Sequence, residues 1–162
     1  MITEFLDFSA SKLAELCSRI ETCLEQLRDD QIWARGKENE NAIGNLALHL
    51  CGNVRQWIVS SIGGQPDLRQ RDSEFAARGG IAKAELQQRL HATVEEAVAI
   101  IRGLTEEKLS ERRTIQGYEV SVMEAIYHVV EHFSMHTGQI IFATKMLTSA
   151  DLGFSRHLQS TP

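Results

Sequence analysis

Apolar residues recur at steps of three and four along four long stretches of this 162-residue chain. This spacing places the apolar side chains on one stripe of an α-helix, which turns once in about 3.6 residues. The first stretch is Leu13, Leu16, Ile20, Leu24 and Leu27. The only prolines are Pro66 and Pro162, so proline interrupts none of the four stretches. The pattern therefore predicts an all-α protein.

The four predicted helices cover approximately residues 5–28, 41–63, 82–103 and 121–147. The last helix has the clearest start, because Ser121 and Glu124 have the spacing of a capping box. The second helix begins near Asn41, a good N-cap residue, and ends at a pair of glycines. We predict no strand, since no stretch shows a strand pattern.

A long glycine-rich connection separates the second predicted helix from the third. Residues 63–80 contain four glycines and many charged residues, with a short helical turn expected at residues 73–76. Such a length allows the chain to cross the molecule between two helices. We therefore predict a four-helix bundle with a long crossover connection between helices two and three. The bundle should form a single domain of residues 1–148, followed by a polar tail of residues 149–162.

Composition excludes several classes of protein. The net charge is −5, whereas nucleic-acid-binding proteins usually carry a basic surface. No apolar run approaches the roughly 20 residues of a membrane span, and the N-terminus lacks the pattern of a signal peptide. The three cysteines, Cys17, Cys23 and Cys51, form an odd and unpatterned set, which favours reduced thiols and a cytoplasmic location.

Three histidines on the fourth predicted helix suggest a metal site. His128, His132 and His136 are spaced by four residues, which places neighbouring imidazoles on one helix face roughly 6 Å apart. Two such imidazoles can bind one metal ion, and His49 on the second helix could supply a third ligand. Three neutral nitrogen ligands leave a coordination position open, as in catalytic sites. The alternative is a histidine cluster at the edge of the core that binds no metal.

Other polar residues near these histidines could orient the imidazoles or line a pocket. They are Asn45, Asn53, His128 and Gln139. A metal-bound imidazole normally donates its second N–H to a carbonyl, amide or carboxylate. In the long connection, Arg71, Asp72 and Glu74 could form a lid or an anion clamp, but an ion-pair network that holds the connection to the bundle is favoured.

Three segments resemble the DinB/YfiT-like superfamily of metal-dependent enzymes, and in particular a small bacterial branch of unknown function. The segments are His49-Leu-Cys-Gly-Asn-Val-Arg-Gln-Trp57, residues 64–75 and His132-Phe-Ser-Met-His-Thr-Gly-Gln-Ile140. The resemblance implies a four-helix bundle with a crossed connection and a divalent ion, most often zinc or nickel, held by His49, His132 and His136. It also implies a homodimer and a small-molecule substrate.

The resemblance favours a class of reaction without identifying a substrate. Related proteins of the superfamily include transferases and isomerases that use a low-molecular-weight thiol, so a thiol-dependent S-transferase acting on small electrophiles is the leading hypothesis. A metal-dependent hydrolase is the nearest alternative. A non-catalytic metal-binding module of a stress response would instead need a fourth protein ligand that closes the site. A dimeric scaffold that needs no ion is the remaining alternative.

Overall fold

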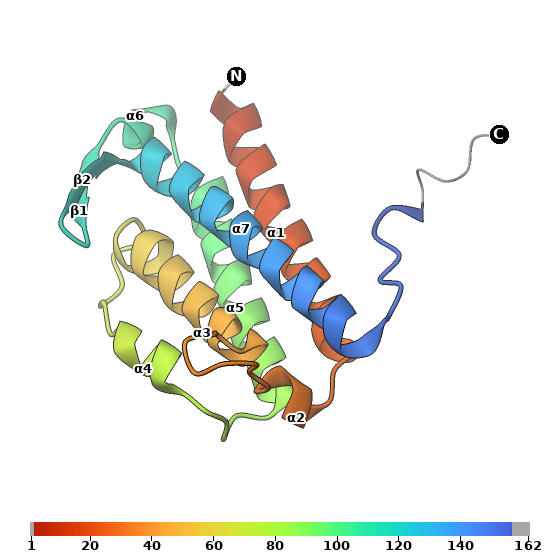
Figure 1. Ribbon diagram of the computed structural model, residues 1–162. Coiled ribbons are helices and arrows are strands. Elements are labelled where there is room, and N and C mark those ends of the chain that lie inside the picture. Colours follow the sequence, from red (N-terminus) through yellow and green to blue (C-terminus); the bar gives the residue numbers. More distant parts are fainter. Residues whose placement is uncertain (1, 157–162) are drawn as a thin grey trace.

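Four long helices form the body of the molecule in the computed structural model, which describes residues 2–156 (Figure 1). They are α1 (Ile2–Glu25), α3 (Ile43–Val54), α5 (Lys83–Arg102) and α7 (Val122–Thr148). In Figure 1, α1 and α7 run downward, whereas α3 and α5 run upward. Since α3 and α5 are parallel, the chain between them must return along the length of the bundle. The predicted all-α bundle with a crossover connection is confirmed.

Each long helix of the bundle packs mainly against two of the others. Helix α1 contacts α5 and α7, and α3 contacts the same two helices. The apolar stripe of each helix faces the shared core, where Leu13, Ile20 and Phe133 are completely buried. An apolar stripe of this kind stabilises a helix by burial more than by intrinsic propensity. Helix α7 therefore lies between α1 and α3, with one side directed at each.

The crossover connection between α3 and α5 is fixed to the outside of α3. It contains α4 (Arg71–Ala76), which packs against α3. Buried Asn45 donates hydrogen bonds from its Nδ2 to the carbonyl oxygens of Glu74 (2.8 Å) and Ala77 (2.9 Å). The loop before α3 contains α2 (Asp29–Ile32), and Trp33 beyond it donates from Nε1 to the Ile81 carbonyl. These bonds satisfy buried backbone groups and hold the crossover in place.

A short β-hairpin lies between the third and fourth predicted helices, where no strand was predicted. Strand β1 (Arg112–Ile115) pairs with β2 (Tyr118–Ser121), with Ile115 opposite Tyr118. The turn residues Gln116 and Gly117 both have positive φ angles, as the two-residue turn of a tight hairpin requires. The prediction of no strand was wrong here, because strands of four residues are too short to show a clear alternation. A short helix, α6 (Glu106–Leu109), precedes the hairpin.

The ends of the long helices follow the sequence signals closely. At the start of α7, the Ser121 side chain accepts a hydrogen bond from the Glu124 N–H, and the Glu124 carboxylate accepts one from the Ser121 N–H. The predicted capping box is therefore present. Helix α3 begins at Ile43 with Ala42 as its N-cap, so the N-cap predicted at Asn41 is wrong by one residue, and it continues as a π-helical segment, η1 (Arg55–Ser60). A π-helical turn is wider than an α-helical turn and is often found at functional sites.

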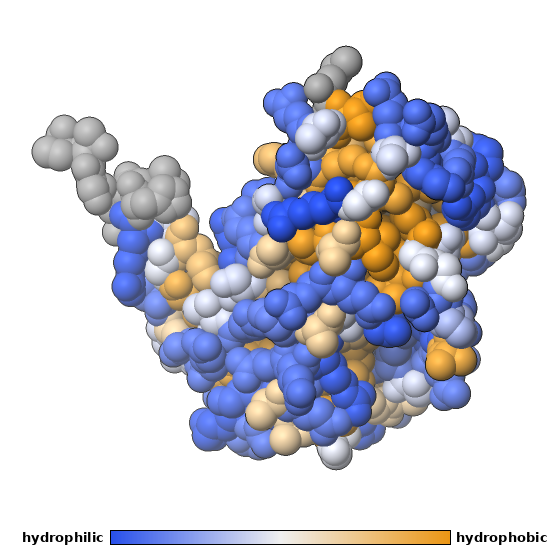
Figure 2. All heavy atoms as spheres, turned by 180° about the vertical axis from the view of Figure 1, so that it is seen from behind, coloured by the Kyte–Doolittle hydropathy of each residue, from blue (hydrophilic) through white to orange (hydrophobic). Residues whose placement is uncertain are grey.

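Parts of the molecule beyond the bundle helices also reach the core. Within the segment predicted as a tail, Leu152 is buried and Phe154 packs against the core, while residues 157–162 lie outside the described part of the chain. The division into a domain and a tail stays a prediction. Seen from behind, a hydrophobic area reaches the surface in the upper half of the molecule, surrounded by hydrophilic side chains (Figure 2). Among the described helices, none has the length and apolar composition that crossing a membrane requires.

Candidate metal centre

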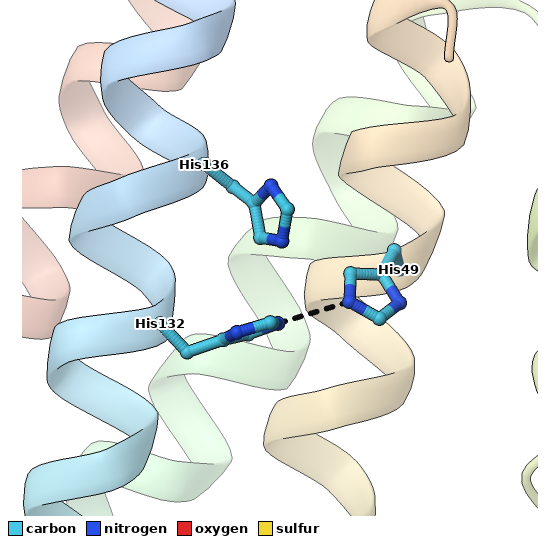
Figure 3. A group of neighbouring side chains, drawn as sticks. All are labelled: His49, His132 and His136. Carbon is cyan, nitrogen blue, oxygen red and sulfur yellow. Dashed lines mark hydrogen bonds between the residues drawn. The ribbon is translucent and has the colours of Figure 1, made fainter. Parts of the chain in front are cut away.

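Three histidines from two helices point toward one another between α3 and α7. His49 belongs to α3, and His132 and His136 belong to α7 (Figure 3). Each residue offers a nitrogen atom that lies within 4.8 Å of those of the other two. The Nε2 atoms of His49 and His132 are 2.9 Å apart, a contact in which one ring donates and the other accepts a hydrogen bond. The structure thus brings together the three residues that the resemblance to the DinB/YfiT-like superfamily implied as metal ligands.

Burial keeps the histidines of α7 uncharged at neutral pH. It lowers the pKa of His132 to about 3, an effect reinforced by the nearby His136 and His49 rings. Burial also lowers the pKa of His136, although a hydrogen bond with Gln139 acts in the opposite direction. Neutral imidazoles have free lone pairs, which is the form that binds metal ions.

A carboxylate from the crossover orients His49. The Glu74 Oε2 atom lies 3.0 Å from Nδ1 of His49, so protonated Nδ1 can donate to it and leave Nε2 free. Arg69 holds the carboxylate on its other side through two hydrogen bonds, from Nε to Oε1 (2.8 Å) and from Nη2 to Oε2 (2.9 Å). Burial raises the pKa of Glu74, but the bonds from Arg69 and His49 outweigh it and leave the pKa lowered.

Gly52 makes room for this carboxylate on the surface of α3. A Cβ atom at position 52 would lie 1.9 Å from Oε1 of Glu74 and 2.9 Å from Nε of Arg69. Distances this short cannot be accommodated without moving the ion pair. Gly52 lies one helical turn after His49, so the absence of a side chain there lets the crossover approach the ligand helix.

The donor set fits a divalent transition-metal ion. Zinc binds imidazole nitrogens at about 2.0–2.1 Å, which places two ligands of a tetrahedral site roughly 3.3 Å apart. The His49 and His132 nitrogens are a few tenths of an ångström closer than this, which a small side-chain rotation corrects. No fourth histidine, cysteine or carboxylate of residues 2–156 joins this cluster. Bound here, an ion would keep a position open for water or substrate.

A pocket of about 350 Å³ lies beside two of the histidines. It is lined by His49, Asn53, Trp57, Arg69, Arg71, Gln116, Tyr118, Val120, His128 and His132. Buried Oδ1 of Asn53 and Nε1 of Trp57 have no hydrogen-bond partner. Within the described chain, no carboxylate lines this pocket. The pocket thus lies against the histidine cluster, and two residues of its lining each contain a buried polar atom that is unsatisfied.

The four other predicted residues have distinct places. Gln139 accepts a 2.7 Å hydrogen bond from Nδ1 of His136, as a residue that orients this ring would. His128 packs against Trp57 in a tilted arrangement with ring centroids 4.0 Å apart, and lines the pocket together with Asn53. The side-chain bonds of Asn45 go to the crossover and to Arg35, so Asn45 acts on the site through Glu74.

Of the three residues predicted to form an ion-pair network in the crossover, Glu74 forms an ion pair, but not with Arg71 or Asp72. Its partner is Arg69, a residue that was not predicted to take part. Arg71 instead lies over the ring of Phe75 and lines the pocket, and Asp72 is exposed. In the sequence, this ion pair is signalled only by opposite charges five positions apart. The fold reveals that both side chains reach His49.

The sequence matches the model of a family described as "Protein of unknown function (DUF1572)" over residues 1–155. The chain belongs to the DUF1572 family. A comparison with curated proteins gave no match. The family relationship covers the bundle, the crossover and the hairpin, so it includes all residues of the candidate site.

Solved structures that resemble this DUF1572 chain have the DinB-like fold. A conserved protein from Enterococcus faecalis superposes with a TM-score of 0.71 at 16% identity, over 88% of this chain and 96% of that chain. The DinB-like protein YjoA from Bacillus subtilis gives 0.68 at 18% identity, over 90% and 96%. A variant of mycothiol-dependent maleylpyruvate isomerase gives 0.60 at 14% identity, over 83% of this chain and 60% of the isomerase. The predicted resemblance to the DinB/YfiT-like superfamily is confirmed at the level of the fold.

Proposed function

We propose that this protein is a metal-dependent enzyme that transfers a low-molecular-weight thiol to a small electrophilic substrate. The observation that carries the proposal is the convergence of His49, His132 and His136 beside an open pocket. When bound to them, a divalent ion, with zinc or nickel as the leading candidates, lowers the pKa of a thiol held against it and so makes the thiolate available. In the reaction, a sulfur–carbon bond forms, the bond from carbon to the leaving group breaks, and the thiol proton leaves with that group or to solvent.

The chain's own residues bind and orient the reactants. Glu74 and Gln139 fix the rings of His49 and His136, so that the ligand nitrogens face one point. Asn53 and Trp57 line the pocket and so shape the space open to a substrate. Arg71 and Arg69 give the pocket a positive character, although Glu74 balances the charge of Arg69.

The lack of a carboxylate in the lining of the described pocket favours thiol transfer over hydrolysis, and leaves His128, which lies outside the ligand set, as the candidate base for a hydrolase. Hydrolysis usually requires a carboxylate or histidine that takes a proton from the attacking water. Glu74 is the carboxylate next to the histidines, and its oxygens are already bonded to Arg69 and His49. A thiol is far more acidic than water, so it needs no such base. The mycothiol-dependent isomerase with a similar fold also supports a thiol as co-reactant.

We also propose a homodimer that forms through the outer face of α7. Four large apolar side chains on this face are exposed: Tyr127 (65%), Met135 (52%), Phe142 (69%) and Met146 (71%). They follow steps of eight, seven and four residues, which keeps them on one stripe of the helix. Gly138 lies within the stripe, and a Cβ at this position would have no neighbour within 4 Å. The stripe therefore allows a second helix to approach closely.

Metal analysis of protein purified without an affinity tag tests the ligand set. We expect His49→Ala and His136→Ala each to contain about one ion per chain fewer than the parent protein, since two imidazoles bind far more weakly than three. His128→Ala is the matched control, because His128 lies on the same face of α7 but outside the cluster, and it should retain the ion. Equal metal content in all four proteins would refute the three-histidine site.

A screen of the metal-loaded protein tests the reaction. Mycothiol, cysteine and glutathione would each be combined with an activated aryl chloride, and the thioether product measured by mass spectrometry. We expect turnover that disappears on metal removal and in His49→Ala, and that returns when the parent protein is reloaded with metal. Metal-dependent release of an acid from ester or amide substrates, without any thiol adduct, would show a hydrolase instead.

A further inference from the structure

A second group of metal-ligating side chains lies on the opposite side of the bundle, between α1 and α5. Cys17 and Glu21 are one turn apart on α1, and His91 and Glu95 are one turn apart on α5. One ligand atom from each of Cys17, Glu21 and His91 lies within 4.8 Å of the other two. None of these four residues belongs to the cluster around His49.

The arrangement follows from the antiparallel packing of the two helices. Residues four apart on a helix share a face, so two such pairs on neighbouring helices can meet across the groove. Oε1 of Glu21 is 2.9 Å from Nδ1 of His91 and 3.8 Å from Sγ of Cys17. Nε2 of His91 is 3.3 Å from Oε1 of Glu95. The imidazole therefore has one nitrogen beside Glu21 and the other beside a second carboxylate.

The surroundings attract a cation. A groove of about 440 Å³ at this position is lined by Glu21, Glu25, Gln87, Gln88, His91, Ala92 and Glu95. Its described lining contains three carboxylates and neither lysine nor arginine. Cys17 itself is buried, with 3% of its surface exposed, so its thiol faces this acidic group from the protein side.

We propose that Cys17, Glu21 and His91 form a second divalent-metal site, suited to zinc, that links α1 to α5. Thiolate, imidazole and carboxylate are the three ligand types that zinc prefers, and three protein ligands with water complete a tetrahedral shell. Glu95 serves as the carboxylate that accepts a hydrogen bond from the second nitrogen of the bound imidazole, an arrangement common around zinc. Binding releases the Cys17 proton to solvent, and the ion's charge offsets the cost of placing a thiolate at a buried position beside carboxylates.

The proposed second site has a sulfur ligand, whereas the three-histidine cluster has none. The absorption spectrum of bound cobalt(II) therefore distinguishes the two sites. A thiolate bound to cobalt(II) gives an intense near-ultraviolet charge-transfer absorption that imidazole ligands do not produce. The experiment titrates cobalt(II) into full-length His49→Ala/His132→Ala protein, in which the three-histidine cluster is disabled. We expect the absorption to develop to a plateau at about one equivalent and to disappear when zinc is added.

Variants assign the ligands. Cys17→Ser should abolish the absorption, while Cys51→Ser, a half-buried cysteine outside the cluster, should leave it unchanged. Since Cys17 is buried and its replacement could disturb folding, His91→Gln and Glu21→Gln provide exposed and half-exposed alternatives. Each should weaken cobalt binding at least about tenfold while the circular dichroism spectrum stays that of the parent.

Two outcomes would overturn the proposal. One is the absence of the charge-transfer absorption in the folded His49→Ala/His132→Ala protein at excess cobalt(II). The other is an absorption that survives in folded Cys17→Ser. Neither outcome affects the proposed thiol transfer, because the two sites share no residue.

Discussion

At the scale of single residues, the candidate metal centre depends on a side chain that lies far from its ligands in sequence. Glu74 accepts a hydrogen bond from His49, 25 positions away, and this bond selects the ring tautomer that offers Nε2 to an ion. The approach is possible because position 52 has no side chain. His49 could be predicted as a ligand from its place on the second helix and from the resemblance to a known superfamily. Its carboxylate partner could not, because no local pattern encodes the path of the crossover.

We predict that Glu74→Gln lowers the affinity for the metal ion about 10–100-fold, as is typical when the hydrogen-bond partner of a bound imidazole is altered. The amide accepts a weaker hydrogen bond from His49, and it leaves the Arg69 charge without its partner. Competition with a chromogenic chelator measures the change in affinity. Asp72→Asn removes an exposed carboxylate from the same short helix and should have no effect. Equal affinities of Glu74→Gln and the parent protein would show that Glu74 only anchors the crossover.

At the scale of the secondary-structure elements, the long helices were predictable and the short elements were not. Helices α1, α5 and α7 follow from apolar residues at steps of three and four, because burial of such a stripe dominates over local detail. The hairpin was missed, although Gln116-Gly117 between Ile115 and Tyr118 is a usable turn signal. The π-helical form of η1 has no signature in the sequence, since it depends on how α3 packs at its end.

The capping box of α7 gives a prediction on pH dependence. Hydrogen bonds from the Ser121 backbone and side chain lower the pKa of Glu124 below its usual value of 4.5. A carboxyl group whose pKa is lower in the folded state stabilises that state fully above its unfolded pKa and loses this contribution as the pH falls through the folded pKa. Glu124→Gln should therefore be less stable than the parent at neutral pH and equally stable in acid.

Urea unfolding of both proteins from neutral to acid pH measures this difference. Ser121→Ala removes the other half of the box and should cost about 1 kcal/mol. This loss should persist in acid, because the serine hydroxyl does not titrate. A stability difference between Glu124→Gln and the parent that stays constant with pH would mean that the Glu124 charge does not contribute.

At the scale of the whole molecule, the exposed stripe of α7 predicts the oligomeric state. Phe142→Glu places a charge in the middle of this stripe and should convert a dimer into a monomer, because a buried unpaired carboxylate is strongly unfavourable. Phe8→Glu is the matched control, since Phe8 on α1 is similarly exposed (64% against 69%) but lies outside the stripe. Light scattering after gel filtration measures the mass. A monomeric parent protein would refute the proposed interface.

The order of the helices makes the two metal groups structurally independent. The histidine cluster joins α3 to α7, whereas the cysteine-containing group joins α1 to α5. Each therefore lies across a different pair of helices, on either side of the shared core. We expect loss of an ion from one to leave the ligands of the other in place, because the two groups share no residue.

The crossover has a consequence for the lifetime of a bound ion. The residues that would hold the ion belong to the bundle, but the carboxylate that orients His49 belongs to a segment outside it. Detachment of this segment would expose the edge of the site while every long helix stays folded, since local opening costs less than global unfolding. Exchange of the ion with its surroundings would then be set by how often the segment opens. The protein could thus bind or release its metal ion while the bundle stays folded, on a timescale much shorter than that of its own unfolding.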